Sequence, residues 1–399
     1  MAEVRRKKAI AANTVYTIAG ALVLNGVLQL FVYPRAASSM GTAAYGGLLY
    51  IMALVNILGP SIGQALNNSR LVMRRDYAVN NGDYFAAVLL MSLIGILCSI
   101  IYARDSLGGG GAVLLLALLI LLTDFRYYGD VEYRLSLDYR RYFFYYTICG
   151  AGYALGYLIG RATGIWQLIF LTGEAAALCY VAAAGCIFRN VTVRTPYFPM
   201  VMRRGGLLVL SYFVTNLTLN MDRLFLKGAL GEEAVAVYYV VSLIGKTLVL
   251  FIAPVNTIVI SYLTKDEEKV TRRRFLVFAA AGVLAAAVFF AGCMIVTPVF
   301  IRLVYPQLVS ETASLIPVVT LTQILAMLSA YLFIVVLTFT GAKWQLALQL
   351  LHLVILLLLI TRMTPGGGLP GFSAGVLIAN TIRILLVLTL GFIKAGRGT

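Results

Sequence analysis

The sequence predicts an all-α polytopic membrane protein with about 12 transmembrane helices, in two six-helix lobes around a central cavity. Three observations lead to this fold class. The 399 residues are 61% hydrophobic and only 12% charged, whereas roughly a quarter of the residues in a soluble domain are charged. Twelve apolar segments follow one another with short connections. Basic residues gather in every second connection, as the positive-inside rule requires of a chain that crosses a bilayer repeatedly.

The apolar segments define the predicted helices in chain order, and most approach the length of about 20 residues that spans a bilayer. They lie at residues 13–33, 43–66, 84–102, 111–125, 142–161, 165–188, 205–226, 234–263, 275–301, 314–340, 343–361 and 371–393. The fourth is the shortest. A polar stretch with two prolines, RNVTVRTPYFPMVMRR, separates the sixth from the seventh. Prolines and polar residues mark connections, so we expect an N-terminal lobe at 1–196 and a C-terminal lobe at 197–399.

An internal repeat supports the two lobes. Residues 34–50 resemble part of residues 211–263: in both places an apolar helix ends near an arginine, Arg35 or Arg223. A glycine turn follows (GTAAYG or GEEAVA), and a tyrosine-containing apolar helix begins. Internal repeats of this kind are typical of secondary transporters. Chance similarity between apolar helices is the alternative.

The distribution of basic residues predicts the topology. Most arginines and lysines lie at the two termini and at 67–83, 126–141, 189–204 and 264–274. The alternate connections carry far fewer, namely Arg35, Arg104, Arg161, Arg223, Lys227, Arg302 and Arg362. Because cytoplasmic loops are the basic ones, we expect both termini in the cytoplasm.

Several classes of function are disfavoured by what the chain contains. The five cysteines lie inside apolar runs without a CxxC pair, which disfavours a metal site or disulfide framework. No phosphate-binding loop of the Walker type occurs, which disfavours an ATP-driven pump. The net charge of +16 fits loop arginines facing anionic lipid better than nucleic acid. We expect no cofactor, no metal and no enzymatic chemistry.

Three ionisable residues fall near the centres of predicted spans: Glu174, Lys246 and Arg383. A charged group inside a membrane is costly, and it faces the bundle interior or a water-filled cavity. We interpret Lys246 and Arg383 as substrate-binding residues and Glu174 as an ion-coupling residue. An interhelical ion pair with a purely structural role is the alternative for all three.

Further candidates lie at the outer ends of two predicted helices. Asn220, Asp222 and Arg223 end the seventh helix, and Arg35 ends the first. Their charge and hydrogen-bonding capacity suit substrate binding, with interface anchoring as the alternative. The only histidine, His352, lies in a strongly apolar helix, where a hydrogen bond to a neighbouring helix is favoured over proton transport.

With these residues in view, the chain resembles the Wzx-type polysaccharide flippases of the multidrug/oligosaccharidyl-lipid/polysaccharide exporter superfamily. The residues that carry the resemblance are NMDRL at 220–224, LGEEA at 230–234, Val237-Tyr238, and Arg35 followed by MGTAAYG at 40–46. The resemblance covers the whole chain, which is somewhat short for the family, chiefly in its loops and fourth span.

The resemblance implies a function, a location and partners. The implied substrate is an undecaprenyl-pyrophosphate-linked oligosaccharide, moved across the bacterial cytoplasmic (inner) membrane. Cationic residues of the family's central cavity meet the anionic carrier, a role that Arg35, Lys246 and Arg383 suit. A coupling cation, proton or sodium, and a polysaccharide polymerase are the other implied partners. Physical chemistry agrees, because a pyrophosphate cannot cross hydrocarbon unaided and two lobes can rock to give alternating access.

Three other functions stay open from the residues. A peptidoglycan-precursor (lipid II) flippase would share the fold and the cationic groups. A multidrug exporter of the same superfamily would favour acidic cavity groups. A membrane glycosyltransferase or O-antigen polymerase would need a sizeable external loop or an exposed acidic base, and the sequence favours neither.

Overall fold

The structure is a computed structural model that describes residues 2–247, 271–337, 340 and 342–395. The chain divides into two compact units, Met1–Phe225 and Leu226–Thr399. This boundary lies within a helix, about 30 residues beyond the polar connection at which the sequence suggested dividing the lobes. The division into six and six helices stays a prediction.

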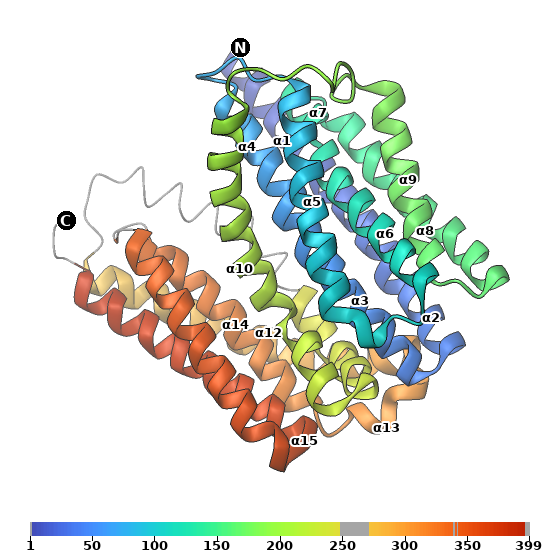
Figure 1. The fold of residues 1–399 in the computed structure, drawn as a ribbon. Coiled ribbons are helices and arrows are strands. Elements are labelled where there is room, and N and C mark those ends of the chain that lie inside the picture. The colour runs from blue at the N-terminus through green and yellow to red at the C-terminus, as the bar shows by residue number, and fades with distance from the viewer. Residues whose placement is uncertain (1, 248–270, 338–339, 341, 396–399) are drawn as a thin grey trace. The chain divides into compact units, whose positions relative to one another are not determined.

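The first unit is a bundle of long helices (Figure 1). Its elements are α1 (Ala2–Gly26), η1 (Val27–Val32), α2 (Tyr33–Met40), α3 (Thr42–Gly59), η2 (Pro60–Gln64), α4 (Ala65–Met73), α5 (Asn81–Ala103), η3 (Arg104–Ser106), α6 (Gly110–Gly129), α7 (Val131–Ser136), α8 (Tyr139–Thr163), α9 (Gln167–Ala184) and α10 (Phe198–Leu230). The last residues of α10 belong to the second unit.

The second unit continues with a helix described over residues 232–247. It then contains α12 (Arg272–Val304), η4 (Pro306–Leu308), α13 (Val309–Thr312), α14 (Ile316–Leu337) and α15 (Ala342–Lys394). A buried core of apolar side chains from α12, α14 and α15 includes Phe275, Leu332, Val335 and Val387.

α15 contains two predicted spans joined by a tight turn. Gly368 has φ 55°, outside helical geometry, in the region that favours glycine. A Cβ on Gly375 would lie 3.3 Å from the backbone of Leu359, and one on Gly371 would meet the carbonyl oxygen of Met363. The chain therefore folds back on itself at Gly368, as the eleventh and twelfth predicted spans require.

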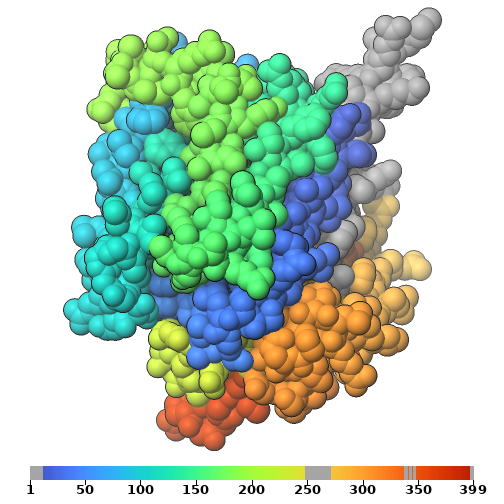
Figure 2. Space-filling view, turned by 90° about the vertical axis from the view of Figure 1, so that its right-hand side faces the viewer, coloured from blue at the N-terminus to red at the C-terminus, as the bar shows by residue number. Residues whose placement is uncertain are grey.

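The predicted fold class is confirmed: the described residues form helices and no strand. Eight of the described helical segments are long and apolar enough to cross a membrane. Figure 2 shows a face of the first unit on which α8 and α9 reach the surface. Leu155 and Leu158 of α8 are 56% and 60% exposed, which suits contact with lipid chains rather than water.

Several helices extend beyond their apolar segments. The segment 126–141, which the sequence placed in an inner loop, is helical as far as Ser136, where Leu137 at φ 56° ends α7. The difference has a physical cause: Arg126 and Asp130 are buried, at 4% exposure each. Hydropathy counts such residues as solvent-facing, but side-chain partners inside the bundle compensate their burial.

Glycines bring α8 and α9 into close contact. A Cβ on Gly152 would lie 2.7 Å from the Cα of Gly173, and one on Gly156 would lie 2.5 Å from the carbonyl oxygen of Ile169. Small residues spaced by four form a flat helix face that lets the backbones approach. This approach positions α9, which carries Glu174, against α8.

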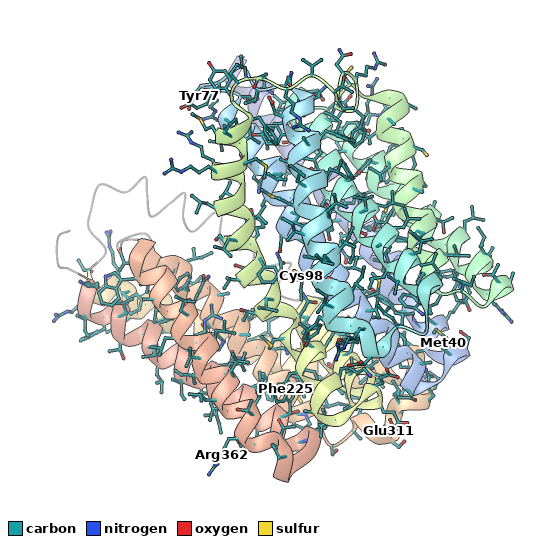
Figure 3. The ribbon with its side chains drawn as sticks, viewed as in Figure 1. Met40, Tyr77, Cys98, Phe225, Glu311 and Arg362 are labelled. Atoms are coloured by element: carbon teal, nitrogen blue, oxygen red, sulfur yellow. The ribbon has the colours of Figure 1, made fainter. Side chains whose placement is uncertain are left out.

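The basic connections of the first unit lie together at one end. The guanidinium of Arg74 donates to the carbonyl oxygen of Leu135 at 3.3 Å, and the Asn81 amide donates to the carbonyl oxygens of Cys186 and Arg189 at 2.8 Å. In Figure 3, Tyr77 marks this end and Met40 marks the opposite one. The predicted alternation of basic and less basic ends is therefore present in the first unit. Which end faces the cytoplasm stays a prediction.

Candidate functional site

A buried ion pair lies inside the first unit, between α6 and α9. The Nε of Arg126 donates to Oε2 of Glu174 at 2.7 Å, and its Nη2 lies 3.4 Å from Oε1. The two side chains are only 5% and 3% exposed. Glu174 also accepts a hydrogen bond from the hydroxyl of Tyr153 at 2.6 Å. The carboxylate thus has three donors, which is what a buried charge needs to persist.

Aromatic groups surround the arginine of this pair. The guanidinium of Arg126 lies 3.8 Å from the centroid of the Tyr127 ring, a cation–π contact. The Tyr145 hydroxyl donates to the carbonyl oxygen of Arg126 at 2.7 Å. The two tyrosines therefore hold both the side chain and the backbone at this point of α6.

A second acid, Asp124, lies two residues before Arg126 in α6. It is fully buried and accepts a hydrogen bond from the Ser92 hydroxyl of α5 at 2.6 Å. Its other oxygen, Oδ1, has no hydrogen-bond partner among the described residues. Asp124 also interacts electrostatically with Glu174. The bundle interior therefore contains two acids and one arginine, and Glu174 interacts with each of the other two residues.

A second polar network lies nearer the basic end of the first unit. Asp130 accepts hydrogen bonds from the Tyr146 hydroxyl at 2.8 Å and from the amide of Asn67, whose oxygen accepts from Arg134 at 2.9 Å. Asp83 accepts from the backbone nitrogen and hydroxyl of Thr195, at 2.7 and 2.8 Å. These contacts stabilise helix ends and hold the polar connection after α9, a structural role.

Contacts within the second unit place Lys246 and Arg383 at one level of α14. Gly245, the residue before Lys246, packs against Gln323, since a Cβ there would overlap the Gln323 side chain. Asn380, three residues before Arg383, donates to the carbonyl oxygen of Thr322 at 3.1 Å. Gly245 and Asn380 thus meet α14 about two turns from Ile316, roughly 10 Å along the helix, and the two cations follow within about one helical turn of these contacts. Both side chains are half-buried.

Arg383 faces the only histidine of the chain. His352, 5% exposed, interacts electrostatically with Arg383 and approaches the backbone of Ala379. A hydrogen bond from His352 to a neighbouring helix stays a prediction. α14 and α15 contain no acidic residue, so the charge of Arg383 is not neutralised by a side chain of these helices.

The other predicted binding residues lie in the first unit. Arg35 is exposed on α2, with its guanidinium 3.8 Å from the centroid of Phe31. Asn220 is buried in α10 and donates to the carbonyl oxygen of Asn216 at 2.9 Å. Asp222 and Arg223 are half-buried on the next turn of α10. These four residues lie on two helices, and their binding role stays a prediction.

Sequence reasoning missed Asp124 and Arg126. It ended the fourth span at residue 125, which left Arg126 in a basic loop and gave Glu174 no partner. A signal was present: that span is too short as drawn, and α6, which runs from Gly110 to Gly129, has the 20 residues that a span needs. Two opposite charges within such a span would then have marked a buried site. Among the described residues, no group of three or more potential metal ligands occurs.

No protein-family model matches the chain, and a search of curated proteins found no match. Solved structures do match over nearly its whole length. An inward-facing multidrug resistance MATE family transporter of the MOP superfamily is 16% identical, with a TM-score of 0.68, covering 95% of this chain and 98% of that chain. The lipid II flippase MurJ in an inward closed conformation is 14% identical, with a TM-score of 0.69, covering 94% and 87%.

A second conformation is also similar. An outward-facing MATE family transporter of the same superfamily is 18% identical, with a TM-score of 0.57, covering 97% of this chain and 95% of that chain. At these identities the likeness concerns the fold. The chain therefore has the all-helical fold that MATE transporters and the lipid II flippase MurJ share.

Proposed function

We propose that the protein is a flippase that moves polyprenyl-pyrophosphate-linked oligosaccharides across the bacterial cytoplasmic membrane by alternating access. The observation that carries this proposal is the placement of Lys246 and Arg383 at one level of α14, inside the apolar part of the second unit. Cationic groups at this depth need water or an anion nearby. A pyrophosphate that passes through the membrane is such an anion, and it needs cations to replace its lost hydration.

The similar structures support this class of function. One of them is a flippase for lipid II, and the others are multidrug transporters. Lys246 and Arg383 lie near each other along α14, and α14 and α15 contain no acidic residue. This excess of positive charge favours an anionic lipid-linked substrate over a cationic drug. Lipid II itself is the second candidate, because the lipid II flippase MurJ shares the fold. The direction of transport, the cytoplasmic termini and a polysaccharide polymerase as partner belong to the same proposal.

Charge reversal at the two cations tests the proposal. Lys246→Glu or Arg383→Glu should abolish surface polysaccharide while lipid-linked oligosaccharide accumulates on the inner leaflet. Lys246→Arg should keep partial activity, because it keeps the charge although the geometry of its donors differs. Arg362→Glu is the matched control: Arg362 is exposed on α15 (Figure 3), and its reversal should leave export unchanged.

The amount of each variant in the membrane must be measured, because misfolding would mimic the loss of transport. Wild-type export by both reversed variants at normal protein levels would show that these cations do not bind the carrier. Accumulation of lipid II in place of the oligosaccharide precursor would favour the second candidate. Loss of drug resistance with normal export would favour a multidrug exporter.

A further inference from the structure

A buried polar atom without a partner lies on the first half of α15, before Gly368. His352 is the only histidine of the chain, and it is 5% exposed. Its ring nitrogen Nδ1 is buried and has no hydrogen-bond partner among the described residues. A buried polar atom that is left unpaired costs free energy, and it calls for an explanation.

The fold-back of α15 brings Arg383 to the level of His352. The two halves of α15 lie side by side beyond the turn at Gly368, since a Cβ on Gly375 would lie 3.3 Å from the backbone of Leu359. His352 lies seven residues before Leu359, and Arg383 lies eight residues after Gly375. The two residues therefore differ in level by about one residue, roughly 1.5 Å along the helices. The electrostatic interaction between their side chains agrees with this register.

The surroundings of Arg383 provide no acid. α12 and α14 are the helices that pack most extensively against α15. Neither of them contains an acidic residue, and neither does α15 itself. The half-buried guanidinium of Arg383 therefore has a positive charge that no side chain of these three helices neutralises.

A neutral imidazole can hold an arginine in place without cancelling its charge. A carboxylate beside Arg383 would form an ion pair with it, and the attraction of the arginine for an anionic ligand would fall. An unprotonated Nδ1 accepts one N–H group, and the guanidinium stays charged because an arginine is not deprotonated in proteins. Four of its five N–H groups then remain for a phosphate. Burial next to a cation, with no acid on these helices, keeps the imidazole itself neutral.

We propose that His352 is a positioning residue, whose Nδ1 accepts one N–H of Arg383 and so directs the other N–H groups toward the phosphate of an anionic substrate. This inference rests on the proposed function, in which Arg383 binds the pyrophosphate of the lipid carrier. Because Nδ1 is unpaired in the structure, the hydrogen bond belongs to the substrate-bound state. Binding then relieves the cost of the unpaired acceptor, and the hydrogen bond adds to the affinity.

The affinity for a probe tests the role of His352. The probe is farnesyl pyrophosphate, a short polyprenyl pyrophosphate, titrated into the full chain in a calorimeter. His352→Leu should weaken binding about tenfold, the effect of losing one hydrogen bond to a charged group. His352→Asn should restore the affinity, because the amide oxygen stands as many bonds from the backbone as Nδ1 does. His352→Gln, whose amide oxygen replaces Nε2 instead, should not restore it.

A matched control and a double-mutant cycle show whether His352 acts through Arg383. Leu351 is 44% exposed on the same turn, and Leu351→Ala should leave the affinity unchanged. In an Arg383→Gln background, His352→Leu should cause no further loss of affinity, since the group that it positions is gone. The same loss in both backgrounds would overturn the inference. Equal affinities of the wild type and His352→Leu would also overturn it and leave the proposed function standing.

Thermal stability distinguishes positioning from a structural role. Leucine removes an unpaired buried atom, so His352→Leu should melt at or above the temperature of the wild type. A lower melting temperature would overturn the inference and favour a hydrogen bond between helices. In a Trp166→Phe background, the fluorescence of Trp344 follows this melt, because the Lys394 ammonium from the other half of α15 lies 5.2 Å from the centroid of the Trp344 ring.

The single histidine also gives a direct spectroscopic signal. In protein labelled with ¹⁵N-histidine and purified without a histidine tag, only His352 contributes. Its Nδ1 resonance should be that of an unprotonated nitrogen, and farnesyl pyrophosphate should shift it toward a hydrogen-bonded acceptor in the wild type but not in Arg383→Gln. A protonated Nδ1 would overturn the inference. If resonance and affinities behave as expected but deletion of the gene leaves surface polysaccharide unchanged, the anion site stands and the proposed function fails.

Discussion

The contact between α8 and α9 offers a sharp test of how the candidate site is held together. In Gly156→Ala, the new Cβ would lie 2.5 Å from the carbonyl oxygen of Ile169 and 2.8 Å from that of Leu168. Ordinary contacts with carbon need about 3.5 Å, so the two helices must separate by roughly 1 Å. Backbone atoms cannot rotate away as a side chain does.

The expected loss of stability follows from this overlap. Overpacking of a buried contact costs about 1–3 kcal/mol. For a unit of this size, each kcal/mol lowers the melting temperature by about 2–4 °C, so Gly156→Ala should melt roughly 2–12 °C below Gly150→Ala, which has the same gain of helix propensity without the overlap. Gly150→Ala is the matched control on the same helix, because its Cβ would lie 3.5 Å from the nearest atom. Alanine there gains about 1 kcal/mol of helix propensity.

Tryptophan fluorescence can follow the melting of the first unit by itself. The chain has two tryptophans: Trp166 packs edge-on against Phe170 in the first unit, and Trp344 is 45% exposed in the second. In a Trp344→Phe background in detergent, the signal of Trp166 therefore reports the contact between α8 and α9. Equal melting temperatures for Gly156→Ala and Gly150→Ala would refute the close-packing argument.

Two further predictions concern the charges. Arg126→Met should destabilise the first unit by about 3–5 kcal/mol, since it leaves the buried Glu174 without its cation. A thermal melt in the Trp344→Phe background measures this loss of stability. A loss below about 1 kcal/mol would contradict the ion-pair geometry. Reporter fusions after Lys227 and after Arg274 should report opposite sides of the membrane, because Lys227 lies in a weakly basic connection and Arg274 follows a strongly basic one. Reporters on the same side at both positions would contradict the two-lobe topology.

The sequence was informative wherever the polarity of a residue matches its surroundings in the folded protein. Long apolar runs have only one way to satisfy their backbone groups in a bilayer, so the helices and their order could be predicted from hydropathy. The glycines of α8 recur at four-residue spacing, which defines one helix face, and the structure packs this face against α9. Lys246 and Arg383 were recognisable as candidates because charges inside apolar segments are rare.

Tertiary structure alone decided which charges meet. Hydropathy treats a charged residue near the end of an apolar run as the start of a loop, and on that ground Arg126 was placed outside the membrane. Its burial is possible only because Glu174, 48 residues further along the chain, lies 2.7 Å away and compensates the lost hydration. That compensation is a property of two helices packed together, so no local pattern contains it. The sequence by itself determined a polytopic helical protein with cations in its spans, and packing decided that Glu174 is paired while Asp124 is the acid without a cation.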